Sequence, residues 1–101
     1  MTRALVFGLG IAGTAVARAL AERDIEPVLV DDRPAAAHDA LATELGATLA
    51  IAPDLGRLSD LVKSVEFVMP APGIPESHPL FSVSADLGRE MLSEIELAYR
   101  W

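Results

Sequence analysis

The chain has 101 residues, of which 51% are hydrophobic, 5% are aromatic and none is cysteine. This length fits one domain with an aliphatic core, and the missing cysteines exclude disulfides and thiolate chemistry. The formal net charge of −7, from 15 acidic and 8 basic residues without a basic run, argues against nucleic acid or an anionic membrane surface as a partner.

Strand-like and helix-like segments alternate along the whole chain. The predicted strands are residues 3–7, 27–30, 48–51, 66–69 and 90–92. The predicted helices are residues 12–22, 35–45, 58–63 and 77–87. This alternation predicts an α/β fold: a Rossmann-like, doubly wound parallel sheet of about five strands with helices on both faces.

Particular residues mark the predicted helix ends. Gly46 and Gly88 follow the second and fourth helices, where glycine readily adopts a left-handed conformation. Ser77 is placed to cap the fourth helix. Ser93 and Glu96 form an S-x-x-E capping box, which predicts that a last helix begins there. Because the chain stops soon afterwards, we expect the natural protein to continue beyond it.

The sequence contains no indication of export or of a membrane anchor. The first predicted strand begins almost at the N-terminus, which leaves no room for a signal peptide. The longest apolar stretch is well short of the ~20 residues that span a bilayer. A cytoplasmic location is therefore expected.

Residues 8–13 read G-x-G-x-x-G and lie between the first predicted strand and the first predicted helix. In such a loop Gly8 permits a tight turn, Gly10 lets a ligand phosphate approach the backbone, and Gly13 lets the helix pack closely on the strand. Unpaired N–H groups at the helix start, together with the helix dipole, favour an anion there. The motif predicts a nucleotide diphosphate site. The alternative is a merely structural turn, although such a turn needs one glycine rather than three.

Two further segments are expected at the same edge of the sheet. Asp31, Asp32 and Arg33 follow the second strand, close to the ~20 residues beyond the glycine motif where an acid binds ribose. Asp31 is placed to accept hydrogen bonds from ribose hydroxyls, and two successive carboxylates would repel a 2′-phosphate. Asp32 is equally explained as an exposed acid at a helix start, and Arg33 as a partner of its own aspartates.

The segment Ala71-Pro72-Gly73 follows the fourth predicted strand. Ligands of a doubly wound sheet bind outside the carboxyl ends of the strands, where the strand order reverses, so this segment is a candidate wall of the site. Its alternative is a turn that merely ends the strand.

No set of residues in the sequence forms a catalytic site. There is no nucleophile beside a general base, no metal cluster and no G-x-x-x-x-G-K-[ST] phosphate loop. The single lysine, Lys63, argues against ATP chemistry within the chain. His38 and His78 have no ligand-spaced partners and are expected on the surface of helices. We therefore expect the chain to bind a ligand without catalysing a reaction or holding a metal.

Four segments, taken together, resemble one known family. They are residues 6–13, residues 30–33, the P-G-I-P turn with its following His-Pro-Leu at residues 71–80, and the S-E-I-E-L segment at residues 93–97. Their order and spacing resemble the N-terminal domain of the MurD family, the UDP-N-acetylmuramoyl-L-alanine:D-glutamate ligases among the Mur ligases. The resemblance covers essentially the whole chain.

The resemblance implies that residues 1–101 are one UDP-substrate-binding domain, cut from a three-domain ligase of peptidoglycan and cell-wall synthesis. Its partner would be UDP-N-acetylmuramoyl-L-alanine, with the diphosphate on the glycine loop and the uridine between the other two segments. The binding residues so implied are Gly8, Gly10, Ile11, Ala12, Gly13, Asp31, Asp32, Arg33, Ala71, Pro72 and Gly73. ATP and Mg²⁺ would bind an absent central domain and D-glutamate an absent C-terminal domain, leaving no cofactor in this fragment.

This chain departs from the family pattern at two candidate site positions. Ala12 and Ala71 stand where family members often have a hydroxyl residue, and each loss removes a hydrogen bond worth about 0.5–1.5 kcal/mol. Pro70 is also unusual at a strand end. We therefore expect weak binding by the isolated domain.

Two other functions are compatible with the same sequence features. One is the NAD(H)-binding domain of a dehydrogenase or of a ligand-sensing regulatory protein. The other is a domain that keeps the fold for assembly and has lost its ligand. A comparison of UDP with NAD separates these readings.

Overall fold

Parallel strands form one sheet in the computed structural model, which describes residues 2–93 and 96–97. Within those residues the sheet has five strands in the order β3-β2-β1-β4-β5. The strands are β1 (Arg3–Phe7), β2 (Glu26–Asp31), β3 (Thr48–Ile51), β4 (Phe67–Pro70) and β5 (Glu90–Met91). Every neighbouring pair is parallel, and β1 lies at the centre between β2 and β4. The strand order reverses there, so the doubly wound topology is confirmed.

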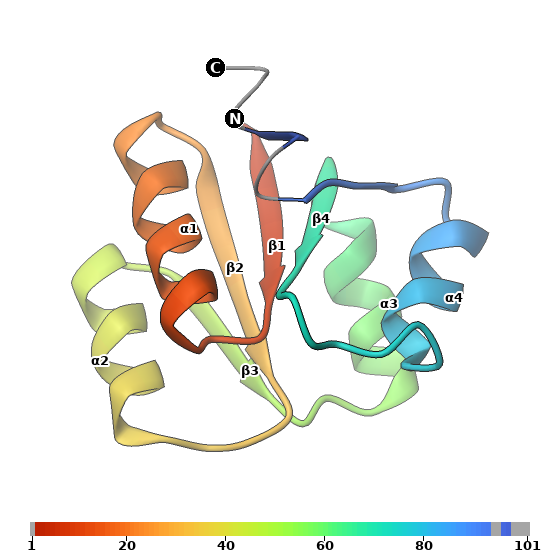
Figure 1. The fold of residues 1–101 in the computed structure, drawn as a ribbon, viewed down its shortest axis with the longest axis horizontal. Coiled ribbons are helices and arrows are strands. Elements are labelled where there is room, and N and C mark those ends of the chain that lie inside the picture. The colour runs from red at the N-terminus through yellow and green to blue at the C-terminus, as the bar shows by residue number, and fades with distance from the viewer. Residues whose placement is uncertain (1, 94–95, 98–101) are drawn as a thin grey trace.

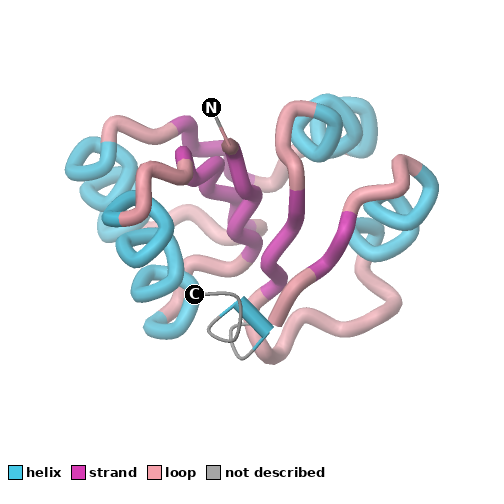
Figure 2. The backbone as a smooth tube through the Cα atoms, turned by 90° about the horizontal axis from the view of Figure 1, so that it is seen from above, coloured by secondary structure: helices cyan, strands magenta, loops and turns pink. Residues whose placement is uncertain are grey.

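Helices cover both faces of the sheet, as predicted. Figure 1 shows α1 (Ile11–Glu22) and α2 (Ala36–Leu45) on one side, with α3 (Leu55–Lys63) and α4 (Pro79–Asp86) on the other. Figure 2, seen along the layers, shows the strands between the two helical layers. No helix in the described part of the chain is both long and apolar enough to cross a bilayer.

Alternation of side chains along β1 divides the core into two clusters. Leu5 and Phe7 pack with α3 and α4, whereas Ala4 and Val6 pack with α1 and α2. All four side chains are at most 1% exposed, because β1 is central and covered on both faces. Phe7 is the one aromatic ring among the fully buried side chains of the described residues, so the core is aliphatic as predicted.

Gly46 and Gly88 have φ values of 60° and 66°, which confirms the left-handed conformation expected at both helix ends. The predicted starts of two helices were wrong. Helix α3 begins at Leu55 because the Asp54 side chain accepts a hydrogen bond from the Arg57 N–H, at 2.8 Å. Helix α4 is capped by His78 rather than by Ser77, and it starts at Pro79.

The capping box at the end of the chain is confirmed. The Ser93 N–H donates to Glu96 Oε1 at 3.2 Å, and the Glu96 N–H donates to Ser93 Oγ at 3.1 Å. Glu96 and Leu97 are helical. The rest of the expected last helix lies outside the described residues.

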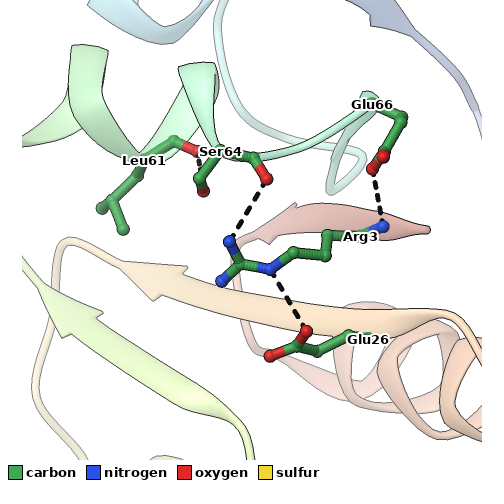
Figure 3. Close-up of polar contacts among 5 residues, drawn as sticks. All are labelled: Arg3, Glu26, Leu61, Ser64 and Glu66. Atoms are coloured by element: carbon green, nitrogen blue, oxygen red, sulfur yellow. Dashed lines mark hydrogen bonds and ion pairs between the residues drawn. The ribbon is translucent and has the colours of Figure 1, made fainter. Parts of the chain in front are cut away.

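The edge where the strands begin is tied together by Arg3 (Figure 3). Its backbone N–H donates to Glu66 Oε2 at 2.6 Å, and its Nη1 donates to the Ser64 carbonyl at 3.3 Å. Its Nε forms an ion pair with Glu26 Oε2 at 3.2 Å. These contacts join β1 to β2 and to the end of α3.

Candidate functional site

The glycine loop leaves three backbone donors free at the start of α1, beside the edge where β1 and β4 end (Figure 1). Gly10 is the N-cap, with an extended backbone and no capping side chain. The first helical hydrogen bond runs from the Thr14 N–H to the Gly10 carbonyl, at 2.9 Å. No acceptor among the described residues meets the N–H groups of Ile11, Ala12 and Gly13. Such a helix start is suited to an anion.

The three glycines of the motif serve different needs. A Cβ on Gly13 would lie 1.8 Å from the Gly8 carbonyl oxygen, so the fold itself requires this glycine. Gly8 has a φ of 95°, and its Cβ would lie 2.8 Å from the Cβ of Ala71. A Cβ on Gly10 would meet nothing within 4 Å. The fold therefore accounts for two of the glycines, and the third faces open space.

A cavity of about 410 Å³ lies beside this loop, within the size range of small-molecule sites. Of the predicted site residues it is lined by Ala12, Gly13, Ala71, Pro72 and Gly73. The structure thus brings two of the three predicted segments together. The remaining lining residues are Val6, Val16, Met69, Pro70, Ile74, Phe81, Met91, Leu92, Ser93 and Glu96.

Asp31 lies against the glycine loop and already holds hydrogen bonds within the protein. Its Oδ2 accepts from the Leu9 N–H at 2.7 Å, and its Oδ1 accepts from the Arg33 N–H at 2.9 Å. His38 Nε2 lies 3.7 Å from the same Oδ2. Asp31 therefore fixes the glycine loop relative to the end of β2. Its predicted hydrogen bonds to a ribose remain a prediction.

Asp32 and Arg33 follow β2 and do not line the cavity. Asp32 Oδ2 lies 2.8 Å from His78 Nε2, in a side chain that is 52% exposed. The Arg33 guanidinium is exposed and forms no ion pair or hydrogen bond with another described residue. Arg33 binds Asp31 through its backbone N–H alone, so the interpretation that its side chain pairs with its own aspartates is wrong.

The surface placement expected for His38 is wrong, whereas His78 lies partly exposed at the start of α4. His38 is 9% exposed, because it shares one face of α2 with Leu41 and Leu45. That helical spacing was the signal that could have revealed its burial. The His78 side chain is 17% exposed and caps α4.

The resolved pKa shifts lie away from this site, between α1 and α2. Arg18 donates two hydrogen bonds to the Glu44 carboxylate, each at 2.9 Å. The hydrogen bond to Glu44 raises the pKa of Arg18, and the same contact lowers the pKa of Glu44. Both side chains are exposed to solvent.

Comparison with known families decides what kind of domain carries this site. Residues 2–93 match the family model described as Mur ligase MurD-like, N-terminal domain. The chain belongs to this family of Mur ligase N-terminal domains. The resemblance inferred from the sequence is confirmed.

Curated relatives of this MurD-like domain are named UDP-N-acetylmuramoylalanine–D-glutamate ligase. The protein of Frankia casuarinae is 36% identical over 97 residues, which are 96% of this chain and 20% of that relative. The protein of Thermus thermophilus is 38% identical over 96 residues, or 95% of this chain and 21% of that relative. The chain thus spans about a fifth of the length of these relatives.

Solved structures with low sequence identity show the fold alone. A pseudomurein peptide ligase type C from Methanothermus fervidus has a TM-score of 0.80 at 18% identity, covering 98% of this chain and 20% of its own. The saccharopine dehydrogenase of Saccharomyces cerevisiae has a TM-score of 0.75 at 18% identity, covering 92% of this chain and 21% of its own. Ligases and dehydrogenases therefore share this architecture, and the site must decide the function.

Proposed function

We propose that this MurD-like domain binds the UDP part of UDP-N-acetylmuramoyl-L-alanine for a D-glutamate-adding ligase of peptidoglycan synthesis. The observation that carries the proposal is the start of α1, where the N–H groups of Ile11, Ala12 and Gly13 have no acceptor among the described residues. Gly10, beside them, leaves open space for a phosphate to approach. A diphosphate supplies the acceptors that these donors lack.

The net charge of the chain supports a phosphate site built from backbone amides rather than from basic side chains. The chain has a net charge of −7, so it offers no general positive field to a diphosphate. Amide dipoles at the start of α1 would hold the phosphates without a lysine. Among the segments of the proposed site, Arg33 supplies the one free guanidinium. It lies with Asp32 after β2, where we place the nucleoside.

The wall opposite α1 is formed by Ala71, Pro72 and Gly73 across the cavity. Ala12 and Ala71 contribute no hydroxyl to this cavity, so the domain binds mainly through backbone groups. We expect the affinity for UDP alone to be correspondingly low.

The reaction itself is proposed for the full-length ligase. There ATP would activate the substrate carboxylate as an acyl phosphate, and the amine of D-glutamate would attack it, in the cytoplasm. We place ATP and Mg²⁺ outside this chain, because its sequence has no G-x-x-x-x-G-K-[ST] phosphate loop and only one lysine. We assign no catalytic residue within it.

Thermal unfolding in the presence of UDP or NAD tests the proposal. A ligand at 100 times its Kd adds about 2.7 kcal/mol to the free energy of unfolding. We expect UDP to raise the Tm of the 101-residue chain more than NAD does at equal concentration. Gly10→Ala is the matched control, because its Cβ fills the proposed phosphate approach without a clash. A response to NAD alone would favour the dehydrogenase reading, and no response to either would favour a domain that has lost its ligand.

A further inference from the structure

His78 joins three separate elements of the domain. Its Nδ1 accepts a hydrogen bond from the Leu80 N–H at 3.0 Å, which caps α4. Its Nε2 lies 2.8 Å from Asp32 Oδ2, in the loop after β2. Its ring meets that of Phe7, the last residue of β1, edge-on with centroids 4.6 Å apart. One imidazole therefore connects the ends of β1 and β2 with the start of α4.

The helix cap fixes the tautomer of this imidazole. The Leu80 N–H is always a donor, so Nδ1 must present a lone pair. The ring hydrogen is then on Nε2, from which it donates to the Asp32 carboxylate. His78 thus donates to an acid through Nε2 and accepts from a backbone amide through Nδ1.

The hydrogen bond between His78 and Asp32 spans the point where the strand order reverses. Asp32 follows β2, and His78 is reached from β4; β1 lies between these two strands. In a doubly wound sheet the ligand crevice opens at this point. The bond therefore crosses from one side of the proposed site to the other.

We infer that His78 is a positioning residue for the nucleoside end of the ligand, an inference that rests on the proposed function. It binds one oxygen of Asp32 and leaves Oδ1 to accept an N–H or O–H from the ligand. It also restrains the loop that carries the free guanidinium of Arg33. Without His78 the Asp32 side chain, already 52% exposed, loses its only side-chain partner among the described residues.

Two substitutions separate the two roles of the ring. The amide oxygen of His78→Asn lies near the position of Nδ1, so this variant retains the cap of α4 but is too short to reach Asp32. The longer amide of His78→Gln reaches Asp32 but does not cap the helix. His78→Asn loses the ring contact with Phe7 and the hydrogen bond to Asp32 but keeps the cap, so we expect it to lower the Tm less than His78→Gln does. We expect it to weaken UDP binding about three- to tenfold, the net worth of one hydrogen bond. We expect His78→Gln to lower the Tm and to retain more of the affinity.

Affinity is measured by titrating UDP against ¹⁵N-labelled protein, with the Tm of each variant recorded alongside. Asp32→Ala alone should weaken UDP binding. Adding His78→Asn to it should lower the affinity for UDP no further. Wild-type affinity in both His78→Asn and Asp32→Ala would show that His78 is only a helix cap, and the proposed function would stand. Failure of the wild-type chain to bind UDP would overturn the inference and the proposed function together.

Discussion

The end of α3, at the amino edge of the sheet, and the start of α1, at the carboxyl edge, treat their unpaired backbone groups in opposite ways. At the amino edge the carbonyls that end α3 are met by the protein's own side chains. Arg3 donates to the Ser64 carbonyl (Figure 3), and Arg89 donates to the Lys63 carbonyl at 3.1 Å. At the carboxyl edge the three free N–H groups of α1 meet no acceptor among the described residues.

This difference teaches where a ligand is needed. Every helix leaves orphan donors at its start and orphan acceptors at its end. At the end of α3, arginine side chains satisfy the orphan carbonyls, so this helix end is complete within the fold. At the start of α1 even the capping residue is Gly10, which has no side chain to offer. The end of α3 is therefore structural, whereas the start of α1 is left for a partner, unlike the starts of α3 and α4, which Asp54 and His78 cap.

The largest expected effect comes from Gly13→Ala, which tests whether the carboxyl edge also has a structural part. The new Cβ would lie 1.8 Å from the Gly8 carbonyl oxygen, which is backbone and cannot turn away. We expect the free energy of unfolding to fall by more than about 3 kcal/mol, beyond ordinary overpacking costs. Urea denaturation measures this. Wild-type stability would mean that α1 does not approach β1 as closely as described.

Gly10→Ala sharpens the comparison within the same motif. Its Cβ meets nothing within 4 Å and the backbone there is extended, so the only expected cost is that of alanine as a poorer N-cap, no more than about 1 kcal/mol. We expect UDP binding to weaken about tenfold or more, because losing one hydrogen bond to a charged phosphate costs about 1.5–3 kcal/mol. Calorimetric titration with UDP checks the second point. If the affinity for UDP were unchanged, Gly10 would not be needed for a phosphate to approach the start of α1.

Arg3→Met, at the amino edge, is expected to lower stability without changing UDP affinity, the reverse of Gly10→Ala. The variant loses the ion pair to Glu26 and the hydrogen bond to the Ser64 carbonyl. We expect it to lower the free energy of unfolding by about 1 kcal/mol, since the pair is only partly buried, and to leave UDP affinity unchanged. Denaturation and titration on one sample measure both. A loss of affinity would show that the two edges are coupled.

Glu44→Gln is expected to have the smallest effect, and that effect is lost at acidic pH. Arg18 lowers the pKa of Glu44 below its ordinary value of 4.5, so this pair contributes stability above that pH. The contribution is lost as the pH falls through the lowered value in the folded state. The Tm difference between wild type and variant should therefore be small at pH 7 and vanish in acid. A difference that grew on acidification would contradict this.

Local pattern was sufficient to predict most of the fold, and it failed where distant segments meet. Strand β1 was predicted to the residue, because a run of apolar side chains ends at the first glycine of the motif. The burial of His38 was readable from its helical spacing with Leu41. The hydrogen bond between His78 and Asp32 could not be predicted from the sequence, because it joins residues 46 positions apart through the packing of α4. The shared cavity of the loop and Ala71 was predicted from topology, since both follow neighbouring parallel strands.

The most direct test observes the three free amides themselves. In a ¹⁵N spectrum of the 101-residue chain, UDP should move the resonances of Ile11, Ala12 and Gly13 further than those of residues at the amino edge such as Ser64 and Glu66. The shifts should saturate with one affinity and be lost in Gly10→Ala. Saturable shifts confined to other parts of the chain would contradict the claim that the start of α1 binds the diphosphate.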